Sequence, residues 1–265
     1  MPVIFAIFSS QSYSQNITQL EYKRETVISV DYLFNNEGLN KPVQIEYSPS
    51  YDMYVVLDIG NTCLYVFDED FKFVRKTSRI GQGPGELLGP KFFSLNPTNS
   101  NIYVYEGGNK RISIFSMNGE FLDSFRINLQ TDQNLEIMSN GTILVNDIKR
   151  EYYITQYSIE GEGLKSIGEI GKSNFADPGS LSNYKGNVFY DDRGYFYIHI
   201  HRSFILKKFD EYGNIIQNYS LASLFGFSTF DDLLMNKDNY IRIFTDIQYK
   251  NGKFYFLQRR GLIDV

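Results

Sequence analysis

The sequence has no tryptophan, one cysteine and two histidines among its 265 residues. The single cysteine, Cys63, excludes an internal disulfide framework, and its place in the apolar stretch TCLYVF favours a small buried residue. No apolar run reaches the roughly 18 residues that a membrane-spanning helix needs. The sequence therefore predicts no membrane span.

An excess of positive charge is also missing. The chain carries 26 Lys and Arg against 31 Asp and Glu, a formal net charge of −5 and a pI near 5.2. Nucleic acids and anionic membrane surfaces require a basic patch on the proteins that bind them. We therefore expect no nucleic-acid partner and no anionic membrane partner.

Tyrosine and phenylalanine, in contrast, are abundant, with 21 and 22 residues and an aromatic fraction of 16%. Aromatic residues favour the pleated, half-buried surface of a strand. Short runs alternate between apolar and polar residues, and helical periodicity is nearly absent. The predicted fold class is therefore all-β.

The N-terminal segment 1–15 has a short apolar core at 3–8 followed by small and polar residues. This order resembles the end of a secretory signal peptide whose basic first region is absent. It predicts export to an extracytoplasmic location, either the periplasm or the cell surface. A buried N-terminal strand is the alternative.

The stretch RIGQGPGELLGPKFF, residues 79–93, packs four glycines into one loop. Phosphate-binding loops use glycines in this way, but they continue with Lys, Ser or Thr and then a helix. Here Gly85 precedes Glu86, whose charge repels phosphate, and Pro90 blocks a helix. The loop is therefore not predicted to bind phosphate.

Repeats determine the expected architecture. An alternating strand ends at an aromatic residue, then a polar turn leads into a second strand, and this hairpin recurs four times at roughly 40 to 50 residue intervals. The aromatic residues are Phe67, Phe115, Tyr157 and Phe209. Two further strands precede each hairpin, so each unit predicts a four-stranded antiparallel blade of a β-propeller. The units span 42–90, 91–130, 134–184, 185–222 and 240–265, within a single domain at 16–265.

Residues 79–122 resemble the NHL repeat, with a glycine-rich loop, a proline, the strand NIYV and an Asn-x-Arg-Ile step. The GQGPGEL loop and the aromatic content resemble the NHL-like or TolB-like six-bladed propeller proteins common in Bacteroidetes, many of which are exported and of unknown function. The resemblance covers about residues 42–265. Glu106 begins the turn where the repeat usually has Asp-x-x-Asn, so the role of that position stays open.

The glycine loop then has a structural role as a linker between blades, because its path must reverse direction there. Glycines permit positive φ, prolines stiffen the chain, and the carboxylate can accept hydrogen bonds from loop N–H groups. The linker residues are Gly81, Gly83, Pro84, Gly85, Glu86 and Pro90. A loop that contacts a ligand is the alternative.

The sequence leaves two possibilities for the number of blades. Residues 222–239 predict a short amphipathic helix or a long connection, and the fifth unit stops inside a strand, as expected for a truncated six-bladed chain. A five-bladed ring is the alternative, with 25–34 supplying the outer strand of the last blade, a closure that removes free edges.

The sequence contains few candidate residues for catalysis or metal binding. His199 and His201 alternate on one strand and are the candidate metal ligands, although zinc needs a third ligand that no nearby residue nominates. Tyr195, Tyr197 and Arg202 beside them are candidate ligand contacts. Packed or surface histidines are the alternative, and paired acidic residues fall mainly at predicted turns.

We expect an exported binding scaffold without catalysis or cofactor, whose partner is a protein, peptide or glycan. Tyrosines suit such interfaces. The alternative is a metal-dependent hydrolase or lyase of the sugar-lactonase or NHL-lyase kind, which would hold Ca²⁺ or Zn²⁺ in its channel.

Overall fold

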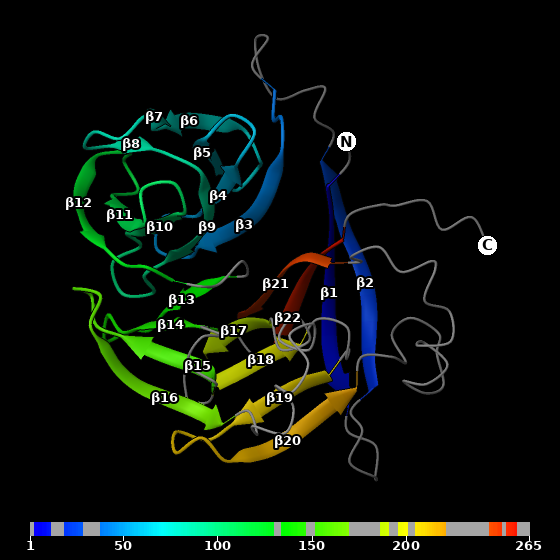
Figure 1. The fold of residues 1–265 in the computed structure, drawn as a ribbon. Helices are drawn as coiled ribbons and strands as arrows, with labels where there is room; N and C mark the ends of the chain where they lie inside the picture. The colour runs from blue at the N-terminus through cyan, green and yellow to red at the C-terminus, as the bar shows by residue number, and fades with distance from the viewer. Residues whose placement is uncertain are drawn as a thin grey trace, which may run out of the picture. The chain divides into compact units, whose positions relative to one another are not determined.

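A computed structural model describes residues 3–11, 19–28, 38–129, 134–146, 152–169, 186–190, 196–200, 205–220, 244–250 and 253–258. All elements in these ranges are β-strands (Figure 1), which confirms the predicted all-β class. The chain forms two compact units, one of Val30–Ile170 and one of Met1–Ser29 with Gly171–Val265.

The first unit in chain order, Val30–Ile170, holds three four-stranded antiparallel sheets, each a simple meander. The first sheet is β3 (Pro42–Ser48), β4 (Met53–Asp58), β5 (Cys63–Asp68) and β6 (Phe73–Thr77). The second is β9 (Pro90–Leu95), β10 (Ile102–Glu106), β11 (Arg111–Phe115) and β12 (Phe121–Arg126). The third is β13 (Leu135–Ile137), β14 (Ile143–Val145), β15 (Tyr152–Tyr157) and β16 (Gly163–Glu169).

The other unit holds two more four-stranded sheets. One is the meander β17 (Gly186–Tyr190), β18 (Phe196–Ile200), β19 (Ile205–Phe209) and β20 (Ile215–Ser220). The other joins both ends of the chain in the order β2-β1-β22-β21, namely Gln19–Ile28, Val3–Gln11, Lys253–Gln258 and Phe244–Lys250.

This last sheet has a strand composition different from the expected one. The five-bladed alternative placed 25–34 alone in this sheet, but two N-terminal strands take part, with β1 paired to β22 and β2 outermost. The apolar segment that resembles a signal peptide lies in β1. The segment 222–239, with its predicted helix or connection, is outside the described residues.

The core lies between sheets, so strands bury both faces. Val104 of β10 belongs to a cluster with Val55 and Leu57 of the first sheet, whereas its neighbours Tyr103 and Tyr105 pack toward the third sheet. The expected alternation of apolar and polar residues therefore does not hold in the middle strands, because β5 and β10 are buried on both faces along nearly their whole length. Repeated sheets of this kind stack because one twisted sheet cannot bury both faces alone.

Each outermost strand of the four meanders begins with a β-bulge. In the first sheet Phe67 pairs with Phe73 and Val66 with Arg75, which leaves one extra residue, Val74. The same register shift occurs in the other three meanders. All four extra residues are exposed aliphatics: Val74 at 38%, Leu122 at 46%, Leu164 at 57% and Ile216 at 48%.

Candidate functional site

The glycine loop ends in a short parallel pairing of β7 (Arg79–Ile80) with β8 (Glu86–Leu87). The Glu86 carboxylate accepts a hydrogen bond from the Gly83 N–H at 2.9 Å and another from Arg79 Nε at 2.9 Å. Both hydrogen bonds lower the pKa of Glu86, and the one from the Gly83 N–H has the larger effect. A Cβ on Gly81 would collide with the same carboxylate, which would then have to move away from its hydrogen-bond donors.

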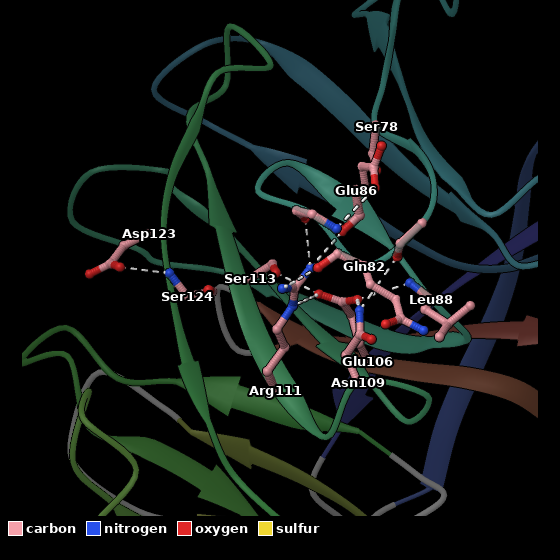
Figure 2. Close-up of polar contacts among 12 residues, drawn as sticks. Ser78, Gln82, Glu86, Leu88, Glu106, Asn109, Arg111, Ser113, Asp123 and Ser124 are labelled. Atoms are coloured by element: carbon pink, nitrogen blue, oxygen red, sulfur yellow. Dashed lines mark hydrogen bonds and ion pairs between the residues drawn. The ribbon is translucent and has the colours of Figure 1, made fainter.

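A buried ion pair fixes this loop to the second sheet (Figure 2). Arg111 Nε donates to Glu106 Oε1 at 2.7 Å, and the two side chains are 14% and 0% exposed. The guanidinium also donates to three loop carbonyls, those of Gln82 at 3.1 Å, Gly83 at 3.1 Å and Glu86 at 2.8 Å. Such a planar fork suits several fixed acceptors at once.

The Glu106 carboxylate has further donors. It accepts from the Leu88 N–H at 2.9 Å, from Asn109 Nδ2 at 2.6 Å and from the Ser113 hydroxyl. A buried carboxylate is stable only when its lone pairs are used in this way. We therefore assign Glu106 to the architecture of the loop and not to catalysis.

Asp58 has the same position at the end of β4. It accepts from the backbone N–H groups of Asn40 at 2.6 Å and Lys41 at 2.9 Å, where the chain enters β3, and from that of Asn61 at 2.9 Å. The turn position that the sequence left open therefore has a defined role. Glu106 takes the place of the Asp of the repeat: it accepts a backbone hydrogen bond from the incoming segment, as Asp58 does, and its longer side chain also reaches Arg111.

Side chains on the innermost strands supply hydrogen bonds to the next sheet. Gln44 accepts from the Phe93 N–H at 2.9 Å and donates to its carbonyl at 2.7 Å, while Glu46 accepts from the Leu95 N–H at 3.0 Å. Ser94 repeats the pattern one sheet later, accepting from the Ile137 N–H at 3.3 Å. An innermost strand is an edge strand, so its outward N–H groups need such partners.

The histidine region is only partly described. His199 and Tyr197 lie in β18, where His199 pairs with Asn187 and Leu206, and Tyr197 pairs with Phe189 and Lys208. Tyr195, His201 and Arg202 are outside the described residues. The metal and ligand-contact assignments for this strand stay predictions.

In the part of the chain that the structure describes, no three His, Cys, Asp or Glu side chains come together as a group able to hold a metal ion. No helix there is long and apolar enough to cross a membrane. The carboxylates that are best ordered by their surroundings, Asp58 and Glu106, bind backbone N–H groups instead.

An aromatic cluster, Tyr47, Tyr54 and Phe71, lies at the opposite end of the first sheet. The ring of Tyr54 stacks on Phe71 with centroids 4.2 Å apart and lies 4.9 Å from the ring of Tyr47. The Tyr47 hydroxyl donates to Asp52 Oδ1 at 2.6 Å, which raises the pKa of Tyr47 to about 12. Tyr51, in the same turn as Asp52, is 44% exposed.

The residue in one hairpin turn distinguishes this cluster in the sequence. The hairpin turns before β12, β16 and β20 each place a glycine at positive φ, namely Gly119, Gly161 and Gly213. The corresponding turn before β6 has Phe71 instead, at φ 59°. A bulky residue is rare and strained in this region, and the ring of Phe71 stacks on Tyr54 there.

Repeated four-stranded antiparallel meanders are typical of a β-propeller, and in the first two sheets a carboxylate binds the segment that leads into the sheet. Residues 36–203, more than half of the chain, match the model of the DUF5128 family, described as a 6-bladed beta-propeller. The chain belongs to this family, which confirms the resemblance to six-bladed propeller proteins.

Two solved Bacteroides structures have a similar fold. A Bacteroides caccae protein of unknown function aligns with a TM-score of 0.51 and 12% identity over 83% of this chain and 74% of its own. A predicted exported protein from Bacteroides fragilis aligns with a TM-score of 0.52 and 14% identity over 80% of this chain and 55% of its own. Virginiamycin B lyase from Staphylococcus aureus aligns at 0.47, with 12% identity over 83% of this chain and 66% of its own. No curated protein matches the sequence significantly.

Proposed function

We propose that this protein is an exported binding scaffold that presents propeller loops and side chains to a protein or peptide partner and performs no catalysis. One observation carries the proposal: the buried carboxylates Asp58 and Glu106 are occupied by structural donors, while aromatic residues lie at the surface of the first sheet. Tyrosine and phenylalanine at a surface supply rigid contact area for recognition.

Export is supported by the apolar segment at 3–8 and by the similar fold of the Bacteroides fragilis protein that is predicted to be exported. Cleavage near residue 15 would remove β1, so a cleaved mature chain could not keep the pairing of β1 with β22 that the full chain shows. Fractionation of the native host, with intact-mass measurement of the protein, tests this part. Full-length protein found only in the cytoplasm would contradict export.

Metal content tests the scaffold against the metal-dependent enzyme. We expect mass spectrometry of the purified chain to find no stoichiometric Ca²⁺ or Zn²⁺, and a chelator to leave the thermal melt unchanged. Stoichiometric metal with a chelator-sensitive melt would replace the scaffold with a metal-dependent hydrolase or lyase. His199→Ala and His201→Ala would then be the first variants to assay.

A further inference from the structure

We propose that the aromatic cluster of the first sheet, Tyr47, Tyr54 and Phe71, binds a lysine or arginine side chain of a peptide segment in the partner. This inference deepens the binding function and rests on it. Three features of the cluster support this binding: the stacked rings, the backbone conformations of the two turns that hold them, and the carboxylates around them.

Two neighbouring turns build the cluster. The turn between β3 and β4 contributes Asp52, which holds the Tyr47 hydroxyl at 2.6 Å, and the turn between β5 and β6 contributes Phe71, which stacks on Tyr54. The three cluster residues are half-buried, and Tyr51 is 44% exposed beside them. The cluster therefore reaches the protein surface at this end of the sheet.

Both turns hold a residue in the left-handed region that glycine usually occupies. Asp52 has φ 51° and Phe71 has φ 59°, whereas the turns equivalent to that of Phe71 use Gly119 at 85°, Gly161 at 86° and Gly213 at 91°. A bulky residue costs about 1 kcal/mol or more in this conformation. Thr62, Ser78, Ser100 and Lys110 also have positive φ, so what distinguishes the turn of Phe71 is a bulky ring at a position where its three equivalents have glycine.

The charge around the rings selects the ligand. Asp52, Glu69 and Asp70 are exposed carboxylates in these two turns, and Lys72 is the single cation there, at 3.1 Å from Asp70. The negative charges of Asp52 and Glu69 contribute to the raised pKa of Tyr47. Such a field repels anionic glycans and phosphate groups but attracts a cation, which also binds the face of an aromatic ring.

The test uses a dye-labelled hexapeptide of alternating Lys and Gly, measured by fluorescence anisotropy against the full chain. Phe71→Gly removes the ring without changing any charge and restores the residue of the other three turns. We expect the variant to bind about 5-fold more weakly. Its melt should stay close to that of the wild type, because relief of backbone strain offsets the lost stacking.

The control variant is Leu122→Ser, which removes an exposed apolar side chain from another sheet and should bind the peptide like the wild type. A labelled Glu-Gly hexapeptide should not bind. No binding of the Lys-Gly peptide, or equal binding by Phe71→Gly, overturns the inference. Binding of a neutral glucose hexamer that needs Phe71 also overturns it, in favour of a glycan site. The scaffold proposal fails separately, through the metal measurement.

Discussion

Single side chains decide how the blades of this protein are joined. Glu106 and Asp58 occupy the same position in consecutive sheets, and each accepts backbone hydrogen bonds from the segment that leads into its sheet. Glu106 adds an ion pair with Arg111, whose guanidinium holds the glycine loop by its carbonyls. The loop conformation therefore depends on residues about 25 positions further along the chain.

Glu106→Ala should lower the free energy of unfolding by about 3 kcal/mol or more, because it leaves Arg111 without its buried partner and the Leu88 N–H without its acceptor. Chemical denaturation measures the loss. The control Glu86→Ala should lose much less, since its ion pair with Arg79 is largely exposed. Equal losses would contradict the assignment.

The loop should also respond to pH through Glu86. Its folded pKa is lowered, so its contribution is present above its ordinary value and is lost as the pH falls through the lowered value. The difference in melting temperature between the wild type and Glu86→Gln should therefore be larger at pH 6 than at pH 3. The same difference at both pH values would show that the Gly83 hydrogen bond does not depend on charge.

At the scale of elements, the β-bulge is the most regular feature that the sequence analysis did not foresee. It begins the outermost strand in all four described meanders, and its extra residue is an exposed aliphatic in each. A bulge increases local twist and interrupts the edge ladder, which protects an outer strand against pairing with another chain.

Leu122→Ser should therefore change the free energy of unfolding by no more than about 0.5 kcal/mol, as for an ordinary surface position. Deletion of Leu122 should be more damaging than the substitution, because it removes the bulge and its added twist and joins the pairs Phe115–Phe121 and Ile114–Asp123 in a regular ladder. Thermal melts of both variants make the comparison. A deletion variant as stable as the wild type would show that the bulge does not contribute to stability.

At the scale of the whole molecule, the two chain ends meet in one sheet. β1 and β2 from the N-terminal segment pair alongside β22 and β21 from the C-terminal segment. Sheets that combine distant segments remove free edges and require long-range loop closure.

Removal of residues 1–28 should therefore destabilise the unit that contains β21 and β22, because β22 loses the whole backbone ladder to β1. We expect a lower melting temperature and concentration-dependent aggregation through the exposed edge. Differential scanning calorimetry with size-exclusion chromatography measures both. A truncated chain that stays monomeric with an unchanged melt would rule out this closure.

Local patterns along the sequence were sufficient to predict the local features of this protein. Alternating strands, turn residues and a repeat of four strands depend on neighbours a few positions apart, so they predicted the all-β propeller class. Linker residues such as Glu86 followed from the same turn chemistry, and its hydrogen bond with Gly83 spans only three positions.

The polar contacts between sheets, in contrast, could be identified only in the tertiary structure. Glu46 and Leu95 are 49 positions apart, and no local pattern marks such a pair. The role of Glu106 likewise required knowledge of which loop lies above β10, and the stacking of Phe71 on Tyr54 required the register of β4 against its neighbours. Contacts of this kind arise from sheet packing, which the spacing of residues along one strand does not encode.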